Sequence, residues 1–135
     1  MEIAFEWYDT NNPILGIKNY IPICELEIRK KDKTWVRFVF KIDGGADTIL
    51  MKESDCLDLG YSLEGCQQLE FRTANKSIRA HVRMLDMKIS GHVIKNIPVA
   101  FSTCPINTLL LGRAKIFEML DIYFLHKHKN TVFAS

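Results

Sequence analysis

The stretch VRFVFKIDGGADTILM, residues 36–51, places a carboxylate between a strand-like run and a turn. Asp43 ends a series of alternating apolar residues and is followed directly by Gly44 and Gly45. A carboxyl group can act as a general acid or a general base in hydrolysis. Two carboxylates held about 3 Å apart can do both, because they cannot both ionise and so share a proton. Asp43 is therefore a candidate for acid–base chemistry, and it needs a second carboxylate.

A second stretch with a distinctive pattern follows later in the chain, where Leu110-Leu111-Gly112-Arg113 runs from an apolar strand through glycine toward a helix. Each stretch alone has an ordinary interpretation. Asp and Gly are common turn formers, so Asp-Gly-Gly after a strand is usually only a turn. A phosphate-binding loop is another interpretation of the glycines, but it needs a Lys-Ser/Thr pair that DGGADTILMK lacks.

The segments that must position these residues are mostly strand-like. Residues 22–42 contain two alternating runs around the polar turn 30–33, and residues 67–89 predict a second hairpin with its tip near Asn75. A strand is expected at 93–102 and a short apolar strand at 108–112. Residues 121–125 and 131–134 predict two strands around the turn HKHKN.

Two short helices are expected between these strands. The first covers 51–61, where Gly60 suits the left-handed position at a helix end. The second covers 113–120, with Ile116, Phe117 and Leu120 on one face. The length of 135 residues favours one domain, 1–135, in which residues 1–21 form an arm or an edge strand.

Composition excludes several classes of function. A net charge of +2 argues against a dedicated nucleic-acid or membrane-surface binder. No apolar run approaches the roughly 18 residues of a membrane helix, and MEIAFEWYDT does not have the pattern of a signal peptide. The four cysteines are scattered without a CxxC pair, and the two histidines of HKHKN lie in a turn. We therefore expect no metal, no cofactor and a reducing, cytoplasmic location.

The two stretches, taken in this order, resemble the retropepsin-like aspartic proteases, the family of the retroviral proteases and their cellular and prokaryotic relatives. In that family an Asp-Thr/Ser-Gly-Ala turn carries the catalytic aspartate, and a hydrophobic-hydrophobic-Gly motif before a helix supports it. The resemblance covers about residues 22–134. It implies a mostly β fold, a closed barrel-like lobe with orthogonally packed strands and one or two short helices.

The resemblance also implies an activity, an assembly and a set of roles. The protein would be an aspartic endopeptidase acting on peptides or proteins, with Asp43 of each chain of a homodimer forming the catalytic pair. Asp47 would pair with Arg113 in a partly buried, bidentate contact, Gly45 would allow a sharp backbone turn, and the C-terminal strands would form the dimer sheet. The implied substrate-binding residues are Gly45, Ala46, Asp47, Thr73, Ala74 and Asn75, and the implied supporting residues are Gly44, Leu110, Leu111, Gly112 and Arg113.

The chain departs from the family pattern at Gly44, where the family has Thr or Ser. That hydroxyl would hydrogen-bond across the dimer axis, and each lost bond is worth about 0.5–1.5 kcal/mol. The departure predicts a looser dimer and a less rigid pair of aspartates. It also leaves an alternative open, in which the chain is a weak or inactive module of the same fold that binds peptides or dimerises.

Overall fold

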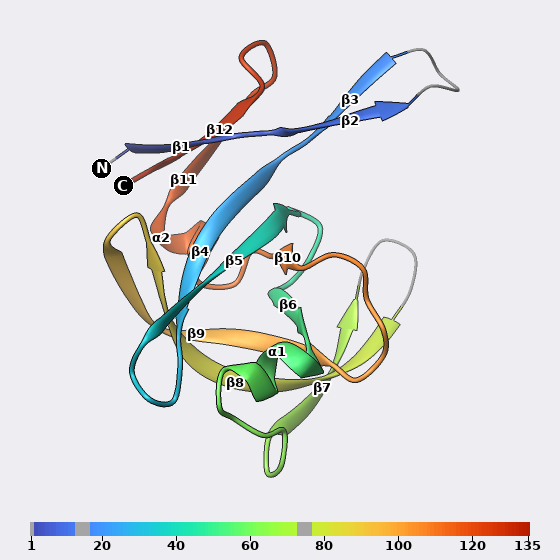
Figure 1. The fold of residues 1–135 in the computed structure, drawn as a ribbon, viewed down its shortest axis with the longest axis vertical. Helices are drawn as coiled ribbons and strands as arrows, with labels where there is room; N and C mark the ends of the chain where they lie inside the picture. The colour runs from blue at the N-terminus through green and yellow to red at the C-terminus, as the bar shows by residue number, and fades with distance from the viewer. Residues whose placement is uncertain (1, 13–16, 73–76) are drawn as a thin grey trace.

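The computed structural model describes residues 2–12, 17–72 and 77–135. Strands dominate it, and two short helices interrupt them (Figure 1). The strands are β1 Glu2–Glu6, β2 Tyr8–Asn12, β3 Ile17–Ile21, β4 Ile23–Arg29, β5 Trp35–Ile42, β6 Ile49–Lys52, β7 Gln67–Arg72, β8 Ser77–Ile89, β9 His92–Ser102, β10 Leu110–Leu111, β11 Asp121–Leu125 and β12 Asn130–Ala134. The helices are α1 Glu53–Asp58 and α2 Ile116–Met119.

Seven strands form the main sheet, in the order β4-β5-β10-β6-β9-β8-β7. The sheet curls until β4 also pairs with β8, with Glu27 opposite Lys88 and Ile28 opposite Met87. Phe40 and Phe101 are fully buried inside this curl and belong to one large apolar cluster. The mostly β, closed and barrel-like fold class predicted from the sequence is therefore confirmed.

The alternating sequence runs form the hairpins that they predict. β4 and β5 pair antiparallel from Ile23–Lys41 to Arg29–Trp35, on either side of the turn 30–33. β7 and β8 pair antiparallel, ending with Arg72 opposite Ser77. The predicted hairpin tip of Thr73, Ala74 and Asn75 lies outside the described residues.

The first helix is shorter than predicted, 53–58 in place of 51–61. Met51 and Lys52 belong instead to β6, which runs parallel to β9 and pairs them with Phe101 and Ser102. The predicted role of Gly60 is confirmed: its φ is +89°, and its N–H donates to the Leu57 carbonyl at the end of α1.

The second helix is also shorter than predicted, 116–119 in place of 113–120, and the preceding strand is only Leu110–Leu111. The amides of Arg113 and Ala114 donate to the carbonyls of Ala46 and Asp47, at 3.1 and 2.9 Å. Lys115 then has a φ of +71°, which excludes it from a right-handed helix. This segment is therefore held by the turn after Asp43.

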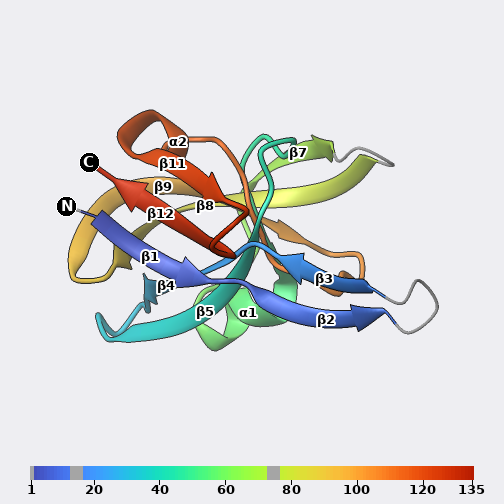
Figure 2. The same ribbon diagram turned by 90° about the horizontal axis from the view of Figure 1, so that it is seen from above.

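The chain ends meet in a second, three-stranded sheet of order β1-β12-β11 (Figure 2). β1 pairs antiparallel with β12, so Glu2 lies opposite Ala134. Trp7 anchors this sheet, because its indole N–H donates to the buried Thr131 hydroxyl at 2.7 Å. β2 and β3 pair with each other and extend beyond β1 (Figures 1 and 2). Within the described residues, no helix is long and apolar enough to cross a membrane.

Candidate functional site

Asp43 follows the last residue of β5, where the strand lies beside β10. Ile42 pairs with Leu111 in parallel register, and the Asp43 N–H donates to the Leu111 carbonyl at 3.0 Å. The Asp43 side chain is half-buried, and its Oδ1 accepts the Gly45 N–H at 2.9 Å. No described residue hydrogen-bonds its other oxygen. The turn therefore fixes one carboxylate oxygen and leaves the second available.

The two glycines after Asp43 have different surroundings, and neither has a positive φ. The chain does turn sharply here, since the Ala46 N–H donates to the Asp43 carbonyl at 3.2 Å, and this turn needs no left-handed backbone at Gly45. What Gly45 provides is space, because a Cβ there would lie 3.3 Å from Asp43 Oδ1. At Gly44 the nearest atom to an added Cβ is Cε2 of Phe117, at 3.9 Å, which is an ordinary contact. A side chain at Gly44 thus fits the single chain without strain.

The segment 110–114 holds the turn 43–47 through backbone contacts. Gly112 lies so close to Thr48 that a Cβ on Gly112 would come within 2.6 Å of the Thr48 nitrogen. The amides of Arg113 and Ala114 donate to the carbonyls of the same turn, as described above. Because a side chain at Gly112 would push the two segments apart, the glycine of the second motif is required by packing.

The Asp47–Arg113 ion pair is present, with Arg113 Nη2 2.7 Å from Asp47 Oδ1. In the single chain the contact is not the predicted bidentate one, and burial of the pair near a dimer interface stays a prediction. One guanidinium nitrogen makes the contact, and the Arg113 and Asp47 side chains are 53% and 63% exposed in the single chain. Such an exposed pair contributes little to stability, about 0–1 kcal/mol by analogy with other surface pairs.

The structure brings together most of the residues that the sequence singled out. Asp43, Gly44, Gly45, Ala46 and Asp47 form one turn, and Leu111, Gly112 and Arg113 lie against it. Ala46 is fully buried in a small cluster with Leu50, Ile78, Ala80 and Ala100, against which Leu110 packs. The Ala46 side chain therefore lies beneath the turn, and its contact with a substrate stays a prediction.

Sequence reasoning missed one residue of this site, Thr48. Its side chain is only 7% exposed, and its hydroxyl donates to the Pro98 carbonyl at 2.8 Å, which ties the turn to β9. A signal was available, since Thr48 is a polar residue directly before the apolar run Ile49-Leu50-Met51. Buried hydroxyls need a partner, so such a position predicts a structural hydrogen bond.

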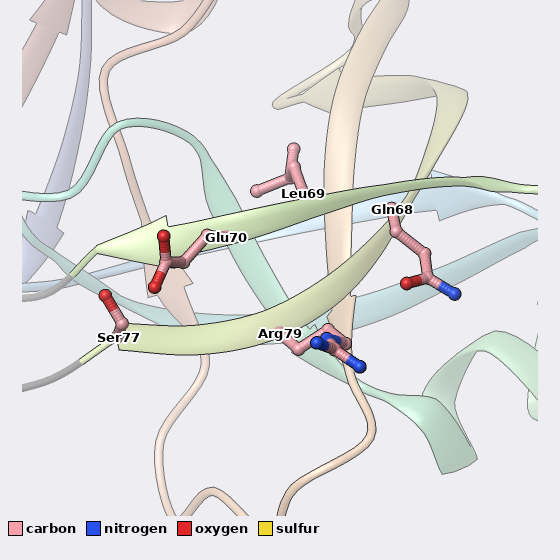
Figure 3. Close-up of a pocket in the computed structure, with 5 residues that line it drawn as sticks. All are labelled: Gln68, Leu69, Glu70, Ser77 and Arg79. Carbon is pink, nitrogen blue, oxygen red and sulfur yellow. The ribbon is translucent and has the colours of Figure 1, made fainter.

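A cavity of about 490 Å³ lies on the β7–β8 hairpin, and Asp43 is not among the residues that line it. It is lined by Gln68, Glu70, Ser77 and Arg79 together with Leu69, whose side chain points to the opposite side of β7 from Gln68 (Figure 3). Another cavity, of about 370 Å³, is lined in part by Lys41 and Leu109. Lys41 is two residues before Asp43, and Leu109 is two residues before Leu111, which accepts the Asp43 N–H. Among the described residues, no group of three or more His, Cys, Asp or Glu side chains is arranged to hold a metal ion.

Comparisons with known proteins agree with this geometry. Residues 27–114, more than half of the chain, match the family model described as aspartyl protease. A retropepsin-like aspartic protease from Rickettsia conorii has a similar structure, with a TM-score of 0.58 and 20% sequence identity over 96% of this chain and 95% of that chain. A search of curated protein sequences finds no match. The family match and the Asp43 turn together show that this chain belongs to the aspartyl protease family, with a retropepsin-like fold.

Proposed function

We propose that the protein is an aspartic endopeptidase that works as a homodimer, with one Asp43 from each chain. The observation that carries the proposal is the Asp43 turn, with Oδ1 held by Gly45 and the whole turn bonded to 111–114. A single chain of this family segment supplies one such turn. A symmetric dimer brings two copies of the same residue to its axis, which provides the second carboxylate.

The chemistry follows from the shared proton of such a pair. The ionised carboxylate takes a proton from water while the water oxygen attacks the peptide carbonyl carbon, and the protonated carboxyl stabilises the carbonyl oxygen. The carboxyl that took the water proton then donates it to the amide nitrogen as the C–N bond breaks, so that the amine leaves neutral and the pair again holds one shared proton. Because the two groups titrate as one unit, the rate should pass through a maximum with pH.

The terminal sheet has an edge at which a partner chain could pair. β11 has one neighbour among the described strands, β12, and its other edge is open. Tyr123, Phe124 and Leu125 on this strand are 52%, 41% and 37% exposed. An open edge with apolar side chains is suited to pairing with another strand. We place the dimer contact at β11, and the activity in the cytoplasm, where the four free cysteines stay reduced.

The first test is cleavage of a peptide library between pH 3 and 7 by the wild type and by Asp43→Asn, with sedimentation of both. The amide oxygen of the introduced asparagine can still accept the Gly45 N–H, so this variant should keep the turn. We expect cleavage by a wild-type dimer and a loss of at least about a thousandfold in the variant, as for removal of other catalytic groups. A stable wild-type monomer without activity at any pH would contradict the proposal.

Mixing the two chains tests whether the site is shared. If subunits exchange freely, an equal mixture contains about a quarter wild-type dimers, as the statistics of a symmetric dimer require. Activity per wild-type chain should therefore fall to about half when Asp43→Asn is added in equal amount. Activity that is unchanged by the addition would show that each chain acts alone.

Gly44 is the reason for the alternative function, a weak or inactive module of the same fold, and a substitution at this position can test it. Gly44→Thr restores the hydroxyl at a position where a Cβ has room. We expect the dimer dissociation constant to fall by at least about twofold, the effect of one weak hydrogen bond. A dimer that binds peptides and cleaves none, with or without the restored hydroxyl, would favour the inactive module.

A further inference from the structure

A cavity of about 370 Å³ opens near Asp43 and has a chemically distinctive lining. Val39 and Lys41 of β5 and Leu109 before β10 form one side of it. Tyr8, Ile21 and Ile23 of the N-terminal strands form another. Asn107 and Thr108 also line it, so the walls combine five aliphatic or aromatic side chains with two neutral polar ones and one lysine.

The cavity lies on the same strand face as the proposed catalytic carboxylate. Phe40 and Ile42 are buried on the inner face of β5, so the intervening residues Val39 and Lys41 point outward, and Asp43 continues that alternation. Residues two apart on one strand face are separated by roughly 7 Å. A peptide held with its scissile bond at Asp43 would thus extend a nearby side chain into this cavity.

The N-terminal strands supply one wall of the cavity. Tyr8, Ile21 and Ile23 precede residue 27, where the match to the family model begins. The body of the fold supplies Val39, Lys41 and Leu109 within the matched segment. These N-terminal residues therefore complete a wall that the matched segment alone leaves open.

Lys41 gives the cavity its charge preference. The residue is exposed, and no described Asp or Glu lies within ion-pair distance of its ammonium group. An unpaired ammonium beside apolar walls matches a side chain that has methylene groups and ends in a carboxylate. Building on the proposed function, we propose that Lys41 makes this cavity select a glutamate side chain of the substrate close to the cleaved bond.

The test is a cleavage profile on a proteome-derived peptide mixture at pH 6, read by mass spectrometry. Wild type should enrich Glu at one position within three residues of the cleaved bond. Lys41→Gln should reduce this enrichment by up to about fivefold, the upper limit for a solvent-exposed ion pair, and Lys41→Glu should replace it with Lys or Arg. Lys95→Gln, an exposed lysine on β9 outside the cavity, is the matched control and should leave the profile unchanged.

Repeating the assay at low pH shows whether the preference depends on the charge of the substrate Glu or only on its size. A substrate Glu has a pKa near 4.3, so the wild-type preference should disappear when the assay is repeated at about pH 3. Cleavage by wild type with an unchanged profile in Lys41→Gln would overturn this inference and leave the proposed function intact.

If wild type cleaves nothing at any pH, the proposed function fails. Peptide binding then tests separately whether the cavity selects glutamate. The probes are fluorescent heptapeptides with a central Glu or Gln, followed by anisotropy with Asp43→Asn. Tighter binding of the Glu peptide that is lost in Asp43→Asn/Lys41→Gln would support the cavity. Equal affinity for both peptides would overturn it.

Discussion

The main sheet and the terminal sheet differ in how they end. The seven-stranded sheet closes through β4 and β8 and encloses the large apolar cluster. The three-stranded sheet of β1, β12 and β11 keeps β11 at an open edge, with Tyr123 and Phe124 exposed. We infer from this difference that the two sheets have different roles. The closed sheet stabilises the fold and positions Asp43, and the terminal sheet provides a surface for a partner chain.

The largest expected effect tests this division with two phenylalanines. Phe40 is fully buried in the main sheet, whereas Phe124 on β11 is 41% exposed. Phe40→Ala should lower the free energy of unfolding by about 3–5 kcal/mol, because it removes buried contacts and leaves a cavity. Phe124→Ala should change it by about 0.5 kcal/mol or less at dilution. Urea denaturation followed by circular dichroism measures both, and equal losses would break the comparison.

A pair of glycines tests how tightly the closed sheet holds the candidate site. Gly112→Ala must displace the Thr48 backbone, so we expect a loss of about 3 kcal/mol or more in the free energy of unfolding. Gly44→Ala has space and a normal backbone, and should change stability by less than about 1 kcal/mol. Thermal unfolding of the two variants measures the difference. A harmless Gly112→Ala would show that the two segments are not in rigid contact.

The terminal sheet has its own buried polar contact, which gives an intermediate effect. Trp7→Phe removes the donor to the buried Thr131 hydroxyl and should cost about 1–3 kcal/mol. Thr131→Val removes the other partner. The double variant should cost less than the sum of the two, with a coupling of about 1 kcal/mol in urea denaturation. Additive losses would mean that the hydrogen bond contributes nothing and that only packing holds this sheet.

The two sheets also differ in how well sequence predicts them. Alternation within 22–42 predicted β4 and β5, because that hairpin joins neighbouring segments. The pairing of β1 with β12 joins the two ends of the chain, and no local pattern records such a partner. The helix boundaries were wrong for the same reason, since Met51 and Lys52 pair with β9 and the amides of Arg113 and Ala114 bond to the turn of Asp43.

The candidate site itself was predicted from motif order, and its physical details were not. The order of Asp43 and Leu110-Leu111-Gly112-Arg113 indicated that these stretches meet, and they do. The space that Gly45 leaves for the carboxylate and the burial of Ala46 depend on neighbours across the sheet. Lys41 was assigned no role, because its place in a cavity depends on strands at the far N-terminus.

The smallest expected effect is at the Asp47–Arg113 pair. The free energy of unfolding should change little if the pair stays exposed, and more if a partner chain buries it. In the single chain both side chains are more than half exposed, so Asp47→Asn or Arg113→Gln should cost about 1 kcal/mol or less in urea denaturation. Salt at about 1 M should abolish that cost by screening the charges. A larger loss that resists salt and grows with protein concentration would mean that the pair becomes buried when a second chain docks. In that case the partner surface would extend from β11 to Asp43, and the terminal sheet would form only part of it.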